Sequence, residues 1–592
     1  MEQVLTPQTI EILLFLTMGL PWVGAILVWL IGDRSPRMQH ILSVAFSALA
    51  GICSIILLFA PKGPNTIVNI SMGNAFGNFT FVLDGLGIFL ATVATVVGSL
   101  AVIFSVDYMK GQDQLGRYYA MVLFFIGAMV GLVLTSNLLL MFIFWEITAL
   151  CSYALISFYN DDPKAVAGGM KALIITQFGG LGLMLGALVL FAYTGSFDIN
   201  MFLANPTLLP ANILTIMAFG CLIAAAAKSA QFPFQTWLPD AMEAPSPISA
   251  LIHAATMVNA GVYLLARFYP AFADVPGWRT SVMVVGMLSA LLAAVMALVA
   301  TDLKRVLAYS TVSQLGYMVY AVGAGGILAS QFHLFSHSIF KALLFLSAGA
   351  VIHSIGTRDM REMGGLGKKM PFVRLVFVVG ALALAGIPIF NGFWSKELIL
   401  ETGMGHGNPI WIYVIMLIVA GLTACYTFRC LWMVFYGESR SEYHVHPVGT
   451  AMKIALTPLA IGAVSSWLLI GPFSKMMGES LPFHEIHELG LLEMMKEVVL
   501  APATWLAVAV VLAGIMTWFG REALGGLIGA FKGVGQIAEK SFGFEAINSG
   551  IVKGVQGLAE KLRFTQTGIL NWNIFAILLS LIIVVAVLVI GV

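Results

Sequence analysis

The sequence predicts an all-α, polytopic membrane protein. Of the 592 residues, 59% are hydrophobic and 10% are charged, whereas an ordinary soluble protein has roughly 25% charged residues. Apolar stretches of about 20 residues recur along the chain, each long enough to cross a hydrocarbon core about 30 Å thick. These stretches lack the apolar–polar alternation of barrel strands, so they are expected to be helices. The composition, with a net charge of +1, excludes a soluble enzyme and a nucleic-acid-binding protein.

About sixteen membrane-spanning helices are expected. The apolar runs that define them lie near residues 11–31, 40–60, 82–105, 118–135, 137–158, 171–193, 212–232, 248–268, 279–301, 303–323, 328–354, 371–390 (extending to about 402), 408–434, 451–473, 498–519 and 569–591. Basic residues gather in the loops after odd-numbered runs, as at Lys110, Arg305 and Arg440. Because positively charged loops stay cytoplasmic, both termini are expected on the outer side of a prokaryotic inner or plasma membrane.

Proline interrupts two of the expected spans. The first interruption follows Lys228 and contains Pro233, and the second covers residues 386–397 with Pro388. A proline inside a helix removes one donor and crowds the preceding turn. Broken backbone at membrane depth is tolerated only beside protein or a water-filled cavity. Two broken spans at corresponding places therefore predict a transporter made of two inverted repeats, with its site at the breaks.

The chain is accordingly divided into six segments. These are N-terminal transmembrane helices (1–115), a first inverted-repeat half (116–270), a second half (271–440), additional transmembrane helices (441–520), an amphipathic lateral segment (521–568) and a C-terminal transmembrane helix (569–592). Apolar residues recur at steps of three and four from Phe544 to Leu562, with Lys553 and Arg563 on other sides. This pattern is typical of a helix lying along the membrane interface or a neighbouring subunit. It fits either a brace that grips a partner or a surface helix that leads to the last span.

Four ionisable residues lie inside or beside apolar runs: Glu146, Lys228, Lys341 and Lys396. A charge at the centre of a membrane helix costs about 2.5–3.5 kcal/mol on insertion, so four of them indicate a function that leucine cannot supply. Desolvation favours the neutral amine of a lysine, and a nearby carboxylate favours the ammonium form. A lysine whose carboxylate partner moves can therefore load and release a proton, and Glu146 is the candidate partner of Lys228. Snorkelling toward an interface and a structural ion pair are the alternatives.

Histidines lie between these charges. His333 and His337 are four residues apart, with Lys341 one turn further along the same expected helix face. His253 lies in the span after the first interruption. A neutral imidazole accepts at one nitrogen and donates from the other, so a row of them suits a proton relay. A zinc site is the competing interpretation, but this face offers no third ligand.

The sequence offers no recognisable site for a cofactor. The five cysteines form no CxxC pair and no Cys/His cluster with metal-site spacing, and neither a Walker loop nor a dinucleotide-binding loop occurs. The glycine-rich run 179–182 lies in an apolar segment, where close helix packing explains it better than phosphate binding. We therefore expect no cofactor and no metal in this chain.

Several strings resemble the antiporter-like proton-pumping subunits of respiratory complex I and their relatives, the Mrp sodium/proton antiporters and membrane-bound hydrogenases. They are FWE at 144–146, AKSAQFPF at 227–234, WLPDAMEAP at 237–245, ALIHAATMV at 250–258, DLKRVLAYST at 302–311, and the stretch 337–353. The resemblance spans roughly residues 80–440. The amphipathic segment followed by one more helix resembles the largest, most distal of the complex I pumping subunits.

The resemblance implies a role for each ionisable residue. Glu146 and Lys228 would form a buried switch pair, and Lys396 would be the terminal exit group. The central relay would consist of His253, His333, His337 and Lys341.

The expected function is proton translocation inside a complex I-like, redox-driven assembly such as an NADH:quinone oxidoreductase. The partners would be other membrane subunits and the lipid bilayer, and the translocated ion a proton or sodium. Two alternatives remain open. One is an Mrp-type sodium/proton antiporter subunit, and the other is the membrane subunit of a bicarbonate-uptake complex with a peripheral zinc protein.

Overall fold

The computed structural model describes residues 5–71, 73, 78–405, 407–443, 445–530, 532–563 and 579. The chain divides into two compact units, residues 1–535 and 536–592. Within the described ranges, 13 helices are long and apolar enough to cross a membrane. The prediction of an all-α, polytopic membrane protein is therefore confirmed.

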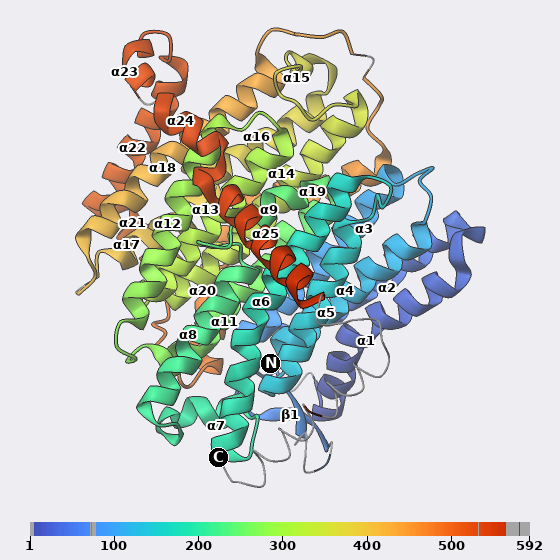
Figure 1. The fold of residues 1–592 in the computed structure, drawn as a ribbon, viewed down its shortest axis with the longest axis vertical. Coiled ribbons are helices and arrows are strands. Elements are labelled where there is room, and N and C mark those ends of the chain that lie inside the picture. Colours follow the sequence, from blue (N-terminus) through green and yellow to red (C-terminus); the bar gives the residue numbers. More distant parts are fainter. Residues whose placement is uncertain are drawn as a thin grey trace. The chain divides into compact units, whose positions relative to one another are not determined.

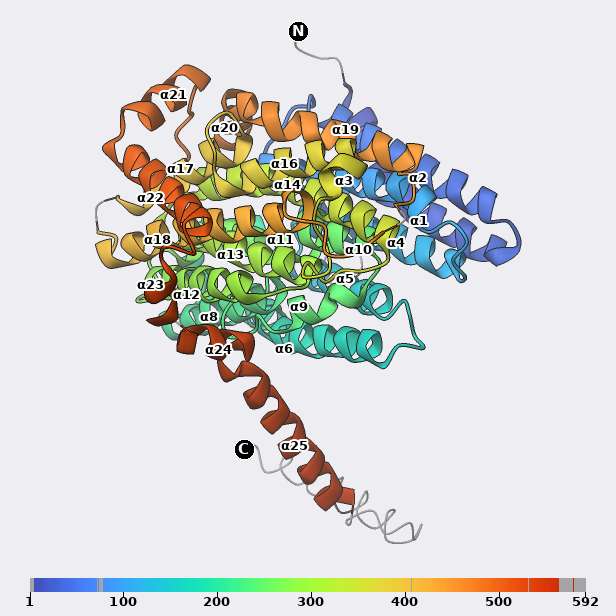
Figure 2. The same cartoon turned by 90° about the horizontal axis from the view of Figure 1, so that it is seen from above.

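The N-terminal helices lie at one edge of the first unit, with α21 and α22 at the opposite edge (Figures 1 and 2). They are α1 (Pro7–Ile31), α2 (Pro36–Leu57), α3 (Gly85–Tyr108) and α4 (Leu115–Leu134). Helix α1 packs against α2 and α4, and Trp22 stacks on Phe124 with 5.2 Å between ring centroids. A small antiparallel hairpin, β1 (Thr66–Ser71) and β2 (Asn78–Val82), lies between α2 and α3. The all-α prediction did not include this hairpin, whose β-branched and aromatic residues favour strands.

The next section of the chain carries the first interruption. Its helices are α5 (Leu138–Ile156), α6 (Pro163–Thr194), α7 (Ile199–Ala204), α8 (Ala211–Lys228), α9 (Trp237–Asp240), α10 (Ser246–Ala250) and α11 (Met257–Phe272). Helices α6 and α8 pack closely, because a Cβ on Gly182 would overlap the main chain of Gly220. This contact agrees with close helix packing as the reason for the glycine-rich run.

The following section carries the second interruption. Its helices are α12 (Trp278–Val299), α13 (Leu303–Ala324), α14 (Ile327–Ile355), α15 (Leu366–Lys369), α16 (Pro371–Ala385), α17 (Asn391–Gly403) and α18 (Ile410–Leu431). The two sections share one feature: in each, the residue that caps a helix also forms a β-bridge to a residue further along the chain. Asn137 caps α5 and bridges Asp198, and Asp302 caps α13 and bridges Asp359. These paired caps are consistent with two repeats, while the inverted arrangement and the six-segment division stay predictions.

Both interruptions are present where proline predicted them. Helix α8 ends at Lys228, and Ala230 then takes a left-handed conformation with φ of 51°. Helix α16 ends at Ala385, and Gly386 and Ile389 follow with φ of 78° and 88°. After the first interruption, Trp237 on α9 donates from its ring to the carbonyl of residue 227 at 2.9 Å. The chain therefore turns back on the half-helix that it has just left.

The remaining helices of the first unit return to its middle and then reach its far edge. They are α19 (Thr450–Ser465), α20 (Ile470–Ser480), α21 (Leu491–Leu500), α22 (Pro502–Phe519) and α23 (Gly525–Ala530). Helix α19 packs against α3 and α14, and the Asp107 carboxylate at the end of α3 accepts the Ala451 N–H at 2.7 Å. This contact joins segments that are 344 residues apart.

The second unit contains α25 (Phe544–Arg563), and α24 (Lys532–Glu539) spans the boundary at residue 535. Ile547, Ile551 and Val555 recur every four residues along α25, so the amphipathic pattern falls on a helix as expected. The expected last span, 569–591, lies outside the described residues except for position 579. Two other expected spans coincide with α13 and with the pair α16 and α17, which are not among the 13 long apolar helices. The count of sixteen stays a prediction.

Candidate functional site

Lys228 and Glu146 lie on neighbouring elements of the first section. Lys228 ends α8, is fully buried and donates from Nζ to the main-chain carbonyl of Trp145 at 2.7 Å. Its Nζ also lies 5.0 Å from the centre of the Trp145 ring. The position is favourable for a cation, because the C-terminal end of a helix carries partial negative charge. Trp145 directly precedes Glu146, so the lysine binds beside the carboxylate.

Among the described residues, the Glu146 carboxylate forms no hydrogen bond or ion pair with the Lys228 ammonium. Its Oε1 is buried and has no hydrogen-bond partner among the described residues. The residue as a whole is only half-buried and shares a helix face with Ile143 and Leu150, which are 38% and 52% exposed. Gly180 on α6 makes room for the carboxylate, because a Cβ there would overlap Oε1. The residues of the predicted switch pair are therefore neighbours in an unpaired arrangement, and Glu146 is more accessible than a buried switch implies.

Lys341 lies in the middle of α14 and is fully buried. Its Nζ donates to the main-chain carbonyl of Leu307 at 3.2 Å and to the Ser310 hydroxyl. Both partners are on α13, and Ser310 Oγ donates in turn to the Leu307 carbonyl at 2.8 Å. The ammonium group is thus held by oxygen atoms of a single helix turn.

Lys396 lies in the first half of α17, beyond the second interruption, and is 2% exposed. Its Nζ donates to the carbonyl of Leu384 at 3.0 Å, in the last turn of α16. The last carbonyls of a helix lack partners within the helix. The break therefore creates the acceptor that this lysine uses.

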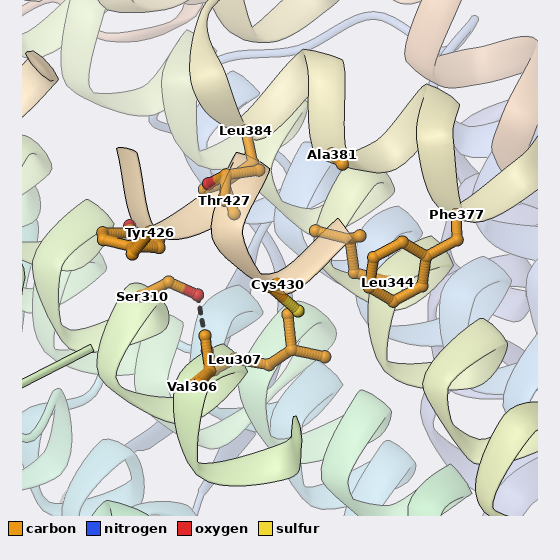
Figure 3. A pocket seen from close by; sticks show the side chains of 10 residues that line it. All are labelled: Val306, Leu307, Ser310, Leu344, Phe377, Ala381, Leu384, Tyr426, Thr427 and Cys430. Atoms are coloured by element: carbon orange, nitrogen blue, oxygen red, sulfur yellow. Dashed lines mark hydrogen bonds between the residues drawn. The ribbon is translucent and has the colours of Figure 1, made fainter. Parts of the chain in front are cut away.

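The partners of Lys341 and Lys396 line one cavity (Figure 3). Leu307 and Ser310 form one wall, and Leu384 lies on another. Thr427 and Tyr426 of α18 also belong to the lining, which is mostly apolar. The cavity is thus shared between the ammonium site on α14 and the one on α17.

The three histidines are fully buried. His333 Nε2 lies 3.1 Å from Gln314 Oε1, and Nδ1 lies 2.9 Å from the hydroxyl of Ser395, the neighbour of Lys396 in the chain. The rings of His333 and His337 are 6.4 Å apart. Both nitrogens of His337 and of His253 lack hydrogen-bond partners among the described residues. Buried polar atoms are generally bonded to protein or to ordered water, so this part of the interior suits bound water.

The geometry decides between the interpretations of the buried lysines. Snorkelling does not apply to Lys228, Lys341 or Lys396, which are at most 2% exposed. Within the described ranges none of the three forms an ion pair, and each ammonium is held by neutral oxygen atoms. A structural ion pair is therefore not the reason for their presence.

Other buried polar residues were not predicted from the sequence. Lys304 is 4% exposed and donates to the carbonyls of Met242 and Ala244 at 2.8 and 2.5 Å. Asp84 and Arg267 form a bidentate ion pair, with side chains 3% and 4% exposed. In the sequence, each of these two residues is only a charge near the end of an apolar run, which does not predict a buried ion pair.

Charged groups outside the spans are held by local contacts. Arg361 donates to Asp359 in the loop after α14, and this hydrogen bonding holds the pKa of the Asp359 carboxyl below its ordinary value. His484 follows α20 and donates from Nε2 to the Ala266 carbonyl at 2.9 Å. Burial lowers the pKa of His484 to about 4.

The fold and the site together define a class of protein: a polytopic membrane protein with a line of buried lysines and histidines beside two broken helices. The chain belongs to the NADH:quinone oxidoreductase/Mrp antiporter family. The transmembrane model of that family matches residues 135–423, and the model of the complex I chain 5 N-terminus matches residues 70–119. All seven predicted site residues lie in the first match.

Curated relatives come from both branches of the family. The F420H2 dehydrogenase subunit L of Methanosarcina mazei is 39% identical over 492 residues, which cover 76% of this chain and 73% of that protein. The NAD(P)H-quinone oxidoreductase chain 5 of Synechocystis is 43% identical over 403 residues, 66% of this chain and 59% of that protein. The Na+/H+ antiporter subunit A1 of Staphylococcus aureus is 40% identical over 412 residues, 65% and 51% of the two chains. The matches thus span between about half and three quarters of these relatives.

Two solved structures share the fold. A chain of the Mrp complex from Dietzia superposes with a TM-score of 0.83 and 28% identity, covering 99% of this chain and 63% of that chain. A chain of an archaeal membrane-bound sulfane sulfur reductase has a TM-score of 0.71 at 24% identity, covering 83% and 99%. The resemblance to complex I and Mrp subunits that the sequence motifs indicated is confirmed.

Proposed function

We propose that this chain translocates protons as a membrane subunit of a complex I-like, redox-driven assembly. The observation that carries the proposal is the shared cavity, because Lys341 and Lys396 donate to residues on its walls. A lysine held by neutral oxygens keeps no fixed counter-ion, so loss of its proton leaves no stranded carboxylate behind. Two such lysines, whose acceptors meet at one cavity, are suited to passing a proton along.

The proposed path begins at Lys228. Approach of the Glu146 carboxylate favours the ammonium form of Lys228, and its withdrawal favours release of the proton inward. The proton then moves over His253 and His337 to Lys341, and across the cavity to Lys396. His333 supports a second connection, because it contacts Ser395 beside Lys396.

The half-buried position of Glu146 supports control by a neighbouring subunit. Ile143 and Leu150 on the same face are exposed apolar side chains, as expected of a surface that meets lipid or a partner. A neighbour that displaces the carboxylate changes the charge state of Lys228, so a distant reaction can drive the relay without contacting it.

The assembly would supply what this chain lacks. Flavin and iron–sulfur clusters would be held by partner subunits, and this chain would hold none. The protein would lie in a prokaryotic inner membrane with both termini outside, and the amphipathic helix α25 would brace it against neighbouring membrane subunits.

A second candidate is an Mrp-type sodium/proton antiporter subunit. It is favoured by the similarity to the Dietzia Mrp chain, which extends over 99% of this chain. Both functions use the same relay, and they differ in the partner subunits and in the driving force.

Purification of the intact assembly from native membranes would test the proposal. We expect iron–sulfur or flavin subunits to copurify, and vesicles containing the assembly to acidify when an electron donor and a quinone are added. Copurification of small antiporter subunits, with proton movement driven by a sodium gradient alone, would establish the second candidate instead. A copurifying zinc protein with bicarbonate-dependent uptake would contradict both.

A further inference from the structure

A group of polar residues at the junction of α3, α10 and α14 has no role in the proposed relay. The rings of His353 on α14 and Tyr108 on α3 lie 5.3 Å apart, centroid to centroid. The Tyr108 hydroxyl lies 3.1 Å from Ser246 Oγ on α10. Ser249 follows three residues later, and His253 four residues after that. Ser246 and Ser249 lie on one face of α10, and His253 lies in the π-helical turn that directly follows it.

Gly349 permits this junction. It lies on α14 one turn before His353, and a Cβ there would come within 2.6 Å of Ser246 Cβ and within 3.7 Å of the Tyr108 ring. Helices α10 and α14 each contact α3 and each other. The absence of a side chain at Gly349 therefore brings Tyr108 and Ser246 together beneath His353.

Burial increases steadily along the group. His353 is exposed and Tyr108 is partly buried, whereas Ser246 is 1% exposed and Ser249 and His253 are fully buried. The Ser249 hydroxyl and both His253 nitrogens lack hydrogen-bond partners among the described residues. Buried hydroxyls and imidazoles of this kind normally bind ordered water. The group thus forms a line of hydrogen-bonding residues from the surface to the relay.

The charges around the two ends differ. His353 lies near Asp107, His446 and Tyr108. His253 lies near Lys304, Lys341 and His337. The loop after α14 carries Arg358 and Arg361, which the positive-inside rule places in the cytoplasm. The His353 end of the line therefore opens on the cytoplasmic face, which carries the basic loops. The His253 end lies near the relay residue Lys341.

On the basis of the proposed function, we propose that protons reach His253 from this face along an uptake track formed by His353, Tyr108, Ser246 and Ser249. Each hydroxyl or bridging water accepts a proton from the preceding group and passes its own to the next, so atoms and charge balance at every step. The track supplies the proton that the central histidines pass on, and the switch at Glu146 and Lys228 sets when it moves to Lys341.

Substitutions on the track test the proposal in vesicles that contain the intact assembly. Tyr108→Phe removes the phenol hydroxyl, and Ser249→Val replaces the serine hydroxyl with methyl groups. We expect each to lower the rate of proton transport about tenfold or more. Ser249→Thr, which has almost the shape of valine but keeps a hydroxyl, should restore most of the rate. The matched control is Tyr320→Phe, because Tyr320 is a buried phenol on α13 whose hydroxyl lies against Gly403 of α17, away from the track.

Lys341→Met separates failure of the track from failure of the proposed function. Native rates for Tyr108→Phe and Ser249→Val, with Lys341→Met inactive, would overturn the uptake track and leave the relay intact. Equal losses for Ser249→Val and Ser249→Thr would also overturn it, because they would indicate a packing role. Native transport by Lys341→Met would instead contradict the proposed function itself.

Discussion

The Glu146 carboxylate occupies the space that a side chain at residue 180 would fill. A Cβ on Gly180 would overlap Oε1 of Glu146, so any side chain at residue 180 would push the carboxylate to another position. The carboxylate lies on the residue that follows Trp145, whose carbonyl binds Lys228. The position of the Glu146 carboxylate therefore depends on glycine at residue 180.

Gly180→Ala should displace the Glu146 carboxylate and slow proton transport by about tenfold, because misplacing a reacting group by an ångström has effects of this order or larger. Gly19→Ala on α1 is the control, since a Cβ there meets nothing within 4 Å. Transport rates in vesicles, normalised to inserted protein, provide the measurement. Equal rates for the two variants would mean that the position of Glu146 does not matter.

Thr427→Val should slow transport severalfold without loss of stability, because Thr427 lines the cavity together with the acceptors of Lys341 and Lys396. Its buried hydroxyl has no partner among the described residues, and valine nearly conserves its volume. The control is Thr176→Val, whose hydroxyl bonds the Ala172 carbonyl of its own helix at 2.8 Å. If Thr427→Val and Thr176→Val transport protons equally well, the cavity is not part of the path.

Arg267→Met should destabilise the protein by about 3–5 kcal/mol, because it leaves the buried Asp84 carboxylate unpaired. Thermal unfolding in detergent measures the effect, and the double variant with Asp84→Asn should recover part of it. Loss of the exposed Lys475–Glu479 pair, whose side chains are 63% and 61% exposed, should cost less than about 1 kcal/mol. If breaking either pair lowers the unfolding temperature by a similar amount, burial does not make the Asp84–Arg267 pair more important for stability.

Stability should fall as the pH is lowered from about 6.5 toward about 4, because burial holds the pKa of His484 at about 4. The unfolded chain binds a proton in this window while the folded chain does not, so acid favours unfolding. His484→Gln should lessen this dependence, as measured by unfolding midpoints across the range. If His484→Gln has the same pH profile as the native protein, the lowered pKa of His484 does not contribute to the loss of stability in acid.

The sequence predicted the buried lysines and the two interruptions for clear physical reasons. A lysine side chain inside an apolar run is not stable in lipid, so it must lie in the protein interior or reach an interface. A proline inside a helix breaks or kinks it. Lys228, Lys341 and Lys396 are accordingly buried.

The partners of these residues depend on tertiary packing and could not be read from local patterns. His333 meets Ser395 across 62 residues, and Lys228 bonds a main-chain oxygen 83 residues away. The burial of Lys304 likewise depends on tertiary packing. Asp302 caps α13, which places Lys304 in the first turn, and its amine donates to the carbonyls of Met242 and Ala244.

The most direct test of the relay compares Lys341→Met and Lys396→Met with Lys62→Met in vesicles that contain the intact assembly. Lys62 also donates to main-chain carbonyls at a helix end, those of Leu58 and Ala60 at 2.6 and 3.0 Å, but it lies outside the proposed path. We expect both relay variants to insert normally and to lose proton transport by about a hundredfold or more, while Lys62→Met transports at the native rate. Native rates for Lys341→Met and Lys396→Met would contradict the account that these buried amines carry protons.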